Sequence, residues 1–244
     1  MKKLIRLFLQ QFGYDIVKYK APFVRGKLGK AAFQQEFSWL SEYHFKTIID
    51  IGANEGQFSD KIRILFPEAK IFAFEPLPAI YENLKLNFSN DQKFIAFNLG
   101  LGDKPESLEF WENEYSPSSS FLSLADSHRD NFQEAIQVQQ VRVQVKTLDQ
   151  VFAEETVDLP LLIKIDVQGF EDKVIRGGIE TIKKASLIIC ELSFVELYKG
   201  QPKFRDLFRE FDELGFDFSG NIEQLRASGN NAILQADGIF VKRK

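Results

Sequence analysis

From residue 46 onward, hydrophobic and polar positions follow two alternating rhythms. Short apolar runs of strand length are each followed by a stretch in which apolar residues recur every three or four positions, the period of a helix. The strand-like runs are at 47–52, 70–76, 93–103, 159–169 and 186–194, and the helix-like stretches are at 55–66, 78–88, 170–182 (interrupted near Gly177-Gly178) and 202–216. This alternation predicts βαβ units around a mostly parallel sheet. Crossovers should be right-handed, with ligands bound beyond the carboxyl ends of the strands.

The middle of the chain has a different pattern. Residues 107–111 and 141–148 alternate like half-exposed antiparallel strands, and between them lies the serine-rich stretch YSPSSSFLSLADSHRDNF, which has no clear period. Long insertions in compact domains are functional lids or disordered segments. We expect an inserted lid on the substrate side at about 104–147. The last residues, NAILQADGIFVKRK, have the pattern of the end of a hairpin.

The first 45 residues are interpreted as a helical extension of one domain at 46–244. Within 4–16, apolar residues recur every four positions and form one face of a helix. That face either docks on the domain or, with the basic residues beside it, contacts a membrane surface or a second copy of the chain. No apolar run reaches the ~18 residues of a membrane-spanning helix. Peripheral membrane contact and a homodimer both remain open.

Composition narrows the classes of function. The 244 residues are 44% hydrophobic and 27% charged, which is ordinary for a soluble globular protein. The net charge of −4 gives no global basic surface, so we expect no nucleic acid as a partner. The single cysteine, Cys190, rules out an internal disulfide framework and a cysteine-based zinc site. It also fits a reducing, cytoplasmic location.

A glycine turn joins the first strand to its helix. Asp50 ends the strand, Gly52 and Gly56 bracket three residues, and the helix follows at once. Glycines allow positive φ and the close approach of a ligand, and the start of a helix offers free N–H donors. A plain strand-to-helix turn without a ligand would have the same sequence. The P-loop Gly-Lys-Ser/Thr is missing. The dinucleotide fingerprint fails because its second and third glycines would fall at Asn54 and Gln57.

A second carboxylate, Glu75, ends the second strand. It lies 19 residues after Gly56, the spacing at which an acidic residue binds ribose hydroxyls. No lysine or arginine accompanies it for phosphates, and Asp50 would repel a pyrophosphate while attracting a cation. A positively charged nucleoside without phosphates fits this pattern, which points to S-adenosyl-L-methionine as the cofactor.

Several motifs extend this interpretation. DIGANEG, FEP, LGD, KIDVQGFE and IRGG, in this order over about 47–194, resemble the FkbM family of S-adenosyl-L-methionine-dependent methyltransferases, with weaker agreement in QADGIFV. The resemblance implies a Rossmann-like class I methyltransferase fold: a mostly parallel seven-stranded sheet, helices on both faces and an antiparallel strand in a C-terminal hairpin. It also implies O-methylation of hydroxyls on sugars, glycans or small natural products.

The resemblance implies a set of cofactor residues as well. Those expected around the methionine part are Asp50, Gly52, Asn54 and Gly56; the one at the ribose is Glu75; those beside the adenine are Asn98, Gly102 and Asp103. Pro76, next to Glu75, is also expected to bind the cofactor. The chain departs from many members of the family at Gln168, where they carry a glutamate. A role for a charge at that position is therefore not expected to transfer.

The fourth strand contains two charges on one face, Lys164 and Asp166. Strands of a parallel sheet covered on both sides are normally apolar, and burying an unpaired charge is costly. The two residues form either a structural ion pair or part of a catalytic site. Because a hydroxyl has to lose a proton near the transition state, the candidate bases are Asp166 first and Glu191 second, with Lys164 orienting Asp166.

Other polar residues are candidates for contact with the acceptor. They are Gln168, Glu171, Ser119, Ser120 and His128, and His128 is also a third candidate base. Glu171 is equally explained as a charge at the start of a helix. Nothing in the spacing calls for a metal, so we expect none. Two alternatives to a methyltransferase stay open: a module that binds S-adenosyl-L-methionine without turnover, and a nicotinamide-dependent oxidoreductase, against which the missing glycines argue.

Overall fold

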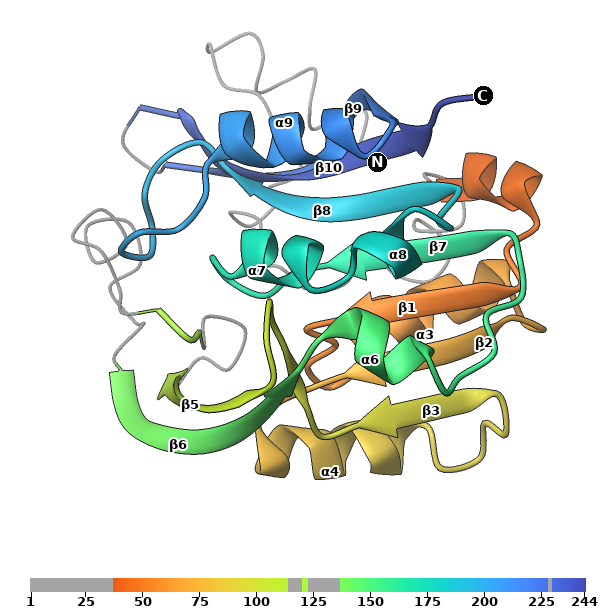
Figure 1. The fold of residues 1–244 in the computed structure, drawn as a ribbon, viewed down its shortest axis with the longest axis horizontal. Helices are drawn as coiled ribbons and strands as arrows, with labels where there is room; N and C mark the ends of the chain where they lie inside the picture. The colour runs from red at the N-terminus through yellow and green to blue at the C-terminus, as the bar shows by residue number, and fades with distance from the viewer. Residues whose placement is uncertain (1–36, 114–119, 123–136, 228–229) are drawn as a thin grey trace, which may run out of the picture.

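The structure, a computed structural model, describes residues 37–113, 120–122, 137–227 and 230–244 (Figure 1). Strands and helices alternate over 47–97 and again over 161–226, as predicted, with successive strands between these parts. In chain order the elements are η1 (Ser38–Tyr43), β1 (Thr47–Ile51), α3 (Gln57–Leu65), β2 (Lys70–Phe74), α4 (Pro78–Asn87), β3 (Phe94–Phe97), β4 (Gly100–Leu101), β5 (Glu106–Asn113), β6 (Gln137–Lys146), α6 (Leu148–Phe152), β7 (Leu161–Ile165), α7 (Glu171–Arg176), α8 (Ile179–Ile182), β8 (Leu187–Ser193), α9 (Phe204–Glu213), β9 (Phe216–Arg226) and β10 (Ile233–Lys242).

The main sheet has seven strands in the order β3-β2-β1-β7-β8-β10-β9. The first five are parallel, whereas β10 is antiparallel to both of its neighbours. The chain moves outward from β1 to β3, then returns to the other side of β1 and continues to the C-terminal hairpin. This topology confirms the predicted Rossmann-like class I methyltransferase fold and makes the ends of β1, β2 and β7 neighbours.

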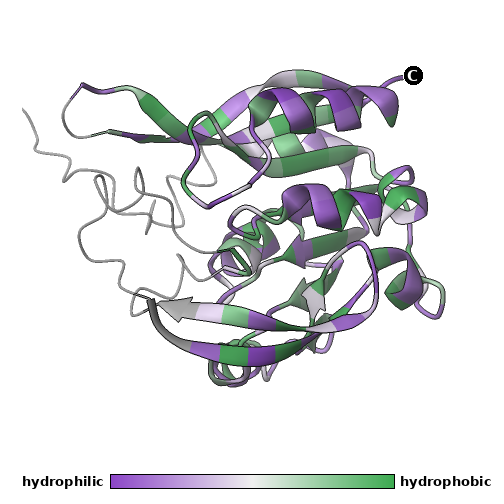
Figure 2. Ribbon diagram, turned by 60° about the vertical axis from the view of Figure 1, so that its left-hand side comes forward, coloured by the Kyte–Doolittle hydropathy of each residue, from purple (hydrophilic) through white to green (hydrophobic). Residues whose placement is uncertain are grey.

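Helices cover both faces of this sheet because its strands are apolar on both sides. On one face Ile49 and Ile51 pack with apolar residues of α6, α7, α8 and α9. On the other face Ile48 packs with Leu40 of η1 and Ile62 of α3. Figure 2 shows the resulting pattern, with hydrophobic central strands and helices that mix polar and apolar positions. Every residue of β1, β7 and β8 is buried.

The inserted segment forms a second, three-stranded sheet in the order β4-β6-β5. The predicted antiparallel pairing is present, with Phe110 opposite Val141. In Figure 1 the arrowheads of β1, β2 and β3 point toward the side of the molecule on which β5 and β6 lie. The described part of the insertion therefore lies near the carboxyl ends of the parallel strands.

Three features were predicted only in part. The helix at 170–182 is divided at Gly177-Gly178 into α7 and α8, as its interruption suggested. Neither the short helix α6 nor the strand β9 was predicted. The expected N-terminal helix at 4–16 lies outside the described residues, but Phe37 at the start of the described part packs into the core with η1. Among the residues described, no helix is both long and apolar enough to cross a bilayer.

Candidate active site

The turn after β1 has the backbone conformation that its glycines allow. Gly52, Asn54 and Gly56 have positive φ angles of 79°, 51° and 91°. A Cβ on Gly52 would lie 1.9 Å from the carbonyl oxygen of Asp166, and one on Gly56 would lie 2.3 Å from the ring of Phe88. Packing against the exit of β7 and against α4 therefore also requires these glycines. Their approach to a ligand stays a prediction.

Charged residues follow the apolar core on one face of the sheet. On the face that α3 covers, Ile48, Leu162, Ile189 and Ile239 are apolar. On each of these strands, the residue two positions closer to the carboxyl ends of the parallel strands is charged. It lies on the same face as the apolar residue, because side chains in a strand alternate between faces. The residues are Asp50, Lys164, Glu191 and Asp237, followed on β7's exit by Asp166. Strand register pairs Asp50 with Lys164 and Glu191 with Asp237. The structure thus brings the predicted catalytic residues together beside Asp50.

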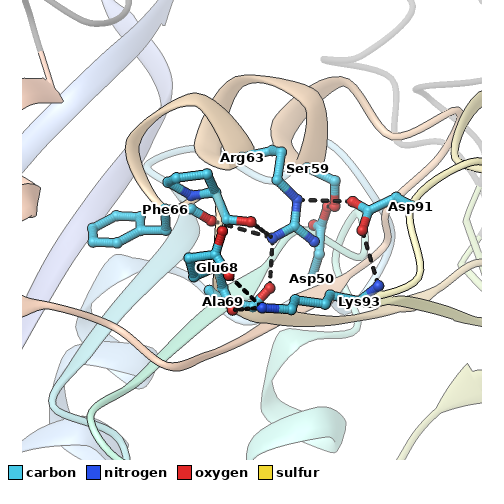
Figure 3. A network of polar contacts seen from close by, with 9 residues as sticks. Asp50, Ser59, Arg63, Phe66, Glu68, Ala69, Asp91 and Lys93 are labelled. Carbon is cyan, nitrogen blue, oxygen red and sulfur yellow. Dashed lines mark hydrogen bonds and ion pairs between the residues drawn. The ribbon is translucent and has the colours of Figure 1, made fainter.

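Asp50 is completely buried, with one oxygen left over. Its Oδ2 accepts a hydrogen bond from the Ser59 hydroxyl at 2.7 Å, while Oδ1 has no partner among the described residues. Burial raises the pKa of Asp50 above its usual value, and the positive charge of Lys164 opposes that rise. Figure 3 shows Ser59 above Asp50, and Arg63 one turn later pairing with Asp91 at 2.8 Å. A buried acceptor of this kind suits a donor from a ligand.

Glu75 connects the ends of three strands. Its Oε2 accepts from the backbone N–H of Asn54 at 3.0 Å, and its Oε1 accepts from that of Leu77 at 2.9 Å. Asn98, at the end of β3, donates to the carbonyl oxygens of Glu75 and Pro76 at 2.9 and 3.0 Å. Burial raises the pKa of Glu75 to about 7, against the lowering effect of its two N–H donors, and the charge of Asp50 adds to the rise. The carboxylates of β1 and β2 are therefore electrostatic neighbours.

The exit of β7 carries a chain of hydrogen bonds. Lys164 Nζ lies 2.8 Å from Asp166 Oδ2 and 5.5 Å from the ring centre of Phe58. Gln168 Nε2 donates to Asp166 Oδ1 at 2.6 Å and to Glu191 Oε2 at 2.8 Å. The predicted ion pair of the fourth strand is present. It is joined to the fifth strand by an amide rather than by a third charge.

Residues from two loops contact Gln168. Ser120 Oγ donates to its carbonyl oxygen at 2.6 Å, and the Tyr198 hydroxyl donates to its Oε1 at 2.8 Å. Gln201 accepts hydrogen bonds from the N–H groups of Leu197 and Tyr198, while its buried Nε2 has no partner in the described part of the chain. Ser119 and His128 lie outside the described residues, so their assignment to the acceptor is still a prediction.

Glu171 binds the backbone of this turn. Its Oε1 accepts from the backbone N–H groups of Val167 and Gly169 at 3.3 and 3.0 Å. Burial raises its pKa to about 7, against the lowering effect of the N–H of Gly169. These contacts favour the interpretation of Glu171 as a structural carboxylate at the start of α7.

Gly102 and Asp103 contact α7 and the glycine that follows it. Asp103 forms an ion pair with Lys173 of α7 at 3.1 Å. A Cβ on Gly177, at the end of the same helix, would lie 1.9 Å from the carbonyl oxygen of Gly102. No contact supports their assignment to the adenine, which remains a prediction. Within the described chain, no three acidic, histidine or cysteine side chains are arranged to bind a metal ion.

Sequence reasoning missed three residues of this region. Asp237 is a lone charge in an apolar strand, a signal that was available in QADGIFV. Tyr198 and Gln201 belong to the loop after β8, and no periodicity distinguishes them from other loop residues. Both are nearly inaccessible to solvent, with 1% and 6% exposure. Only the folded chain shows that Tyr198 contacts Gln168 and that Gln201 lies beside Gly169.

Comparison with known proteins decides the family. The profile described as "Methyltransferase FkbM domain" matches residues 50–218, more than half of the chain. The chain belongs to the FkbM methyltransferase family. This confirms the resemblance inferred from the motifs, and S-adenosyl-L-methionine is the cofactor of this FkbM methyltransferase. The alternative of a nicotinamide-dependent oxidoreductase is thereby excluded.

Two curated relatives and one solved structure illustrate the similarity. The 2-O-methyltransferase NoeI of Sinorhizobium fredii is 31% identical over 72% of this FkbM methyltransferase and 76% of its own length. Methyltransferase 1 of Beauveria bassiana is 29% identical over 53% of this chain and 57% of its own. Magnesium protoporphyrin IX methyltransferase (ChlM) from Synechocystis PCC 6803 with bound SAM is 10% identical, with a TM-score of 0.46 over 99% of this chain and 97% of that one. That structural match is too distant to add to what the strand order shows.

Proposed function

We propose that this FkbM methyltransferase transfers the methyl group of S-adenosyl-L-methionine to a hydroxyl oxygen of a sugar, a glycan or another small hydroxyl compound. The observation that carries the proposal is the row of charges at the ends of β1, β7 and β8. In that row Asp166 keeps 15% of its side-chain surface accessible, while Asp50 and Glu191 are buried. Asp166 is thus the carboxylate that an acceptor hydroxyl can reach.

The proposed cofactor residues lie on the β1 and β2 side of this row. Asp50 Oδ1, buried and without a partner in the described structure, suits the ammonium group of the methionine part. Glu75 has two oxygens for the ribose diol, and both now accept backbone N–H groups. Each oxygen has a second acceptor site, so the ribose hydroxyls can bind Glu75 beside these N–H contacts. The turn containing Gly52, Asn54 and Gly56 lies between the two carboxylates.

The proposed chemistry needs alignment and one base. S-adenosyl-L-methionine, when bound, would supply a methyl group whose bond to sulfur breaks as the acceptor oxygen attacks its carbon in line, with the neutral thioether S-adenosylhomocysteine as the leaving group. Asp166 accepts the proton of the attacking hydroxyl. Lys164, 2.8 Å from Asp166, favours the charged form of that carboxylate and fixes its position. Gln201 Nε2 is a buried donor suited to an oxygen of a hydroxyl-rich acceptor.

The name of one relative supports transfer to oxygen. NoeI is described as a 2-O-methyltransferase, and this chain is 31% identical to it. A hydroxyl acceptor also gives a chemical reason for a basic carboxylate beside the cofactor pocket, because an alcohol is a weak nucleophile until its proton begins to leave.

The test uses the purified chain, labelled S-adenosyl-L-methionine and a panel of monosaccharides, oligosaccharides and polyols. We expect label in at least one acceptor, and a loss of about 10²- to 10⁴-fold in turnover for Asp166→Asn with cofactor affinity unchanged. Glu180→Gln, a change on the exposed side of α8, is the matched control.

Calorimetry tests the pocket separately from the chemistry. We expect Asp50→Ala and Glu75→Ala to weaken cofactor binding by about 10- to 100-fold each, since each removes a charged hydrogen-bond acceptor. Unchanged binding in both variants rejects the assigned pocket. Cofactor binding without transfer to any acceptor would instead favour a binding module.

A further inference from the structure

One amide side chain connects the two candidate bases. Gln168 Nε2 donates to Asp166 Oδ1 at 2.6 Å and to Glu191 Oε2 at 2.8 Å, and Gln168 Oε1 accepts from the Tyr198 hydroxyl at 2.8 Å. An amide nitrogen carries two hydrogens. Each carboxylate therefore receives one of them, and both carboxylates act as acceptors.

Only one orientation of this amide satisfies all three partners. Exchanging its oxygen and nitrogen would direct the oxygen at two carboxylates, which have no hydrogen to donate when ionised. The two carboxylates therefore select the observed orientation, and the Tyr198 hydroxyl, on a residue that is 1% exposed, completes it by donating to the amide oxygen. The backbone of Gln168 has a φ of 56°, which residues other than glycine adopt infrequently. Strain of this kind persists where the surrounding structure requires the side chain in one place.

Other titratable groups surround the two carboxylates. They are Asp50 on β1, Lys164 on β7, Glu171 on α7, Cys190 on β8, Asp237 on β10 and Tyr198 in the loop after β8. Of these groups, only Lys164 carries a positive charge. A neutral donor between Asp166 and Glu191 therefore stabilises both charges without adding to the repulsion among the carboxylates.

We infer that Gln168 is a positioning residue that keeps Asp166 and Glu191 charged together, and that its neutrality sets the pH above which the base is active. The inference rests on the proposed function, in which Asp166 accepts the proton. Tyr198 holds the far end of the amide by its hydrogen bond to Oε1. A third carboxyl at position 168 would force the group to share a proton, because neighbouring carboxylates cannot all ionise together at the same pH.

The decisive variant is Gln168→Glu, with Gln168→Gly as its matched control. The glutamate retains the length of the side chain and replaces the donor by an ionisable acceptor. The glycine removes the amide without adding a charge, and it tolerates the positive φ, so the fold is expected to remain. Side-chain carboxyl carbons are followed by ¹³C NMR against pH, with Asp166→Asn and Glu191→Gln used to assign the signals.

In the wild-type protein we expect the carboxyls of Asp166 and Glu191 to remain ionised from pH 6 to 8. In Gln168→Glu we expect one carboxyl of the group to release its proton at least about one pH unit higher than any does in the wild type. The glycine variant should show no such additional titration. If the glutamate variant titrates in the same range as the wild type, the inference is overturned.

Activity separates this inference from the proposed function. With an acceptor from the panel, the acid limb of the pH–rate profile should move upward by about the same amount in Gln168→Glu. If the carboxyl titration seen by NMR shifts in Gln168→Glu and the pH–rate profile does not, Gln168 does position the carboxylates, but Asp166 is not the base. The NMR result decides the role of Gln168 even when no acceptor of the panel reacts.

Discussion

The turn after β1 and the turn after β7 follow adjacent parallel strands and have similar backbones, but they treat their polar side chains in opposite ways. Asn54 and Gln168 both have a positive φ, 51° and 56°. Asn54 is only half-buried, and its Oδ1 accepts from the neighbouring Glu55 N–H and from Gln57. Gln168 is buried and bridges two strands.

A buried glutamate stabilises each turn, and here too the two differ. Glu75 reaches the first turn from β2, a different strand, and each of its oxygens accepts one N–H. Glu171 belongs to the helix that follows the second turn, and a single oxygen makes both contacts. Glu75 thus ties the first turn to a neighbouring strand, whereas Glu171 ties the second turn to the helix that continues it. The comparison teaches that similar backbone turns can hold their polar side chains differently, with local contacts after β1 and with contacts between strands after β7.

The largest expected effect tests the glycines of the two turns. For Gly52→Ala we expect a loss of at least about 3 kcal/mol in the free energy of unfolding, since the new Cβ would lie 1.9 Å from the Asp166 carbonyl oxygen. For Gly169→Ala, where the nearest atom is at 3.1 Å, we expect about 1–3 kcal/mol from the positive φ. Urea denaturation measures both.

Gly200→Ala is the control for this pair. Its φ of 75° matches that of Gly52, but no atom lies within 4 Å of the added Cβ. It therefore reports the conformational cost alone. Equal losses in all three variants would mean that the first turn is not packed against the exit of β7 as described.

The next effect concerns stability against pH. The carboxyls of Glu75 and Glu171 have their pKa raised by burial from 4.5 to about 7. Between these values the folded state binds more protons than the unfolded state, so stability falls as pH rises. We expect each glutamate to lower the free energy of unfolding by about 3 kcal/mol between pH 4.5 and 8.

Denaturation of the cofactor-free protein at pH 5 and pH 8 measures this effect. Glu171→Gln should remove the part of the pH dependence that comes from Glu171, and this variant should be more stable than the wild type at pH 8. Glu82→Gln, an exposed change on α4, should leave the pH dependence unchanged. A Glu171→Gln variant with the full wild-type dependence would contradict the buried environment described for the second turn.

The smallest effect distinguishes the two glutamates by cofactor binding. If the ribose requires ionised Glu75, the affinity for S-adenosyl-L-methionine should rise about tenfold from pH 6 to pH 8, because the carboxyl titrates near 7. Calorimetry should show the rise in the wild type and in Glu171→Gln, but not in Glu75→Gln. The same dependence of cofactor affinity on pH in all three proteins would contradict the proposal that Glu75, and not Glu171, binds the cofactor.

Most of the fold was predictable because its central strands are buried on both sides. Such strands appear as continuous apolar runs, and a charge within them, such as Asp50 or Lys164, is conspicuous. The helix α6 was missed because five residues are too few to display a period, although Thr147 and Gln150 form a capping box that was visible in the letters. Strand β9 was missed because most of its residues are only half-buried. Its hydrophobic pattern is therefore weak, and its pairing with β10 is visible only in the structure.

The letters alone determined which side chains with acid–base chemistry end each strand, since a charge in an apolar run is a local property of the chain. Only the tertiary structure decided their partners. Gln168 reaches Tyr198 across 30 residues and Ser120 across 48, and Asp237 comes to Glu191 through strand register. A hydrogen bond requires its two atoms to be placed to within a few tenths of an ångström. That placement is set by the packing of strands and loops that are remote in sequence.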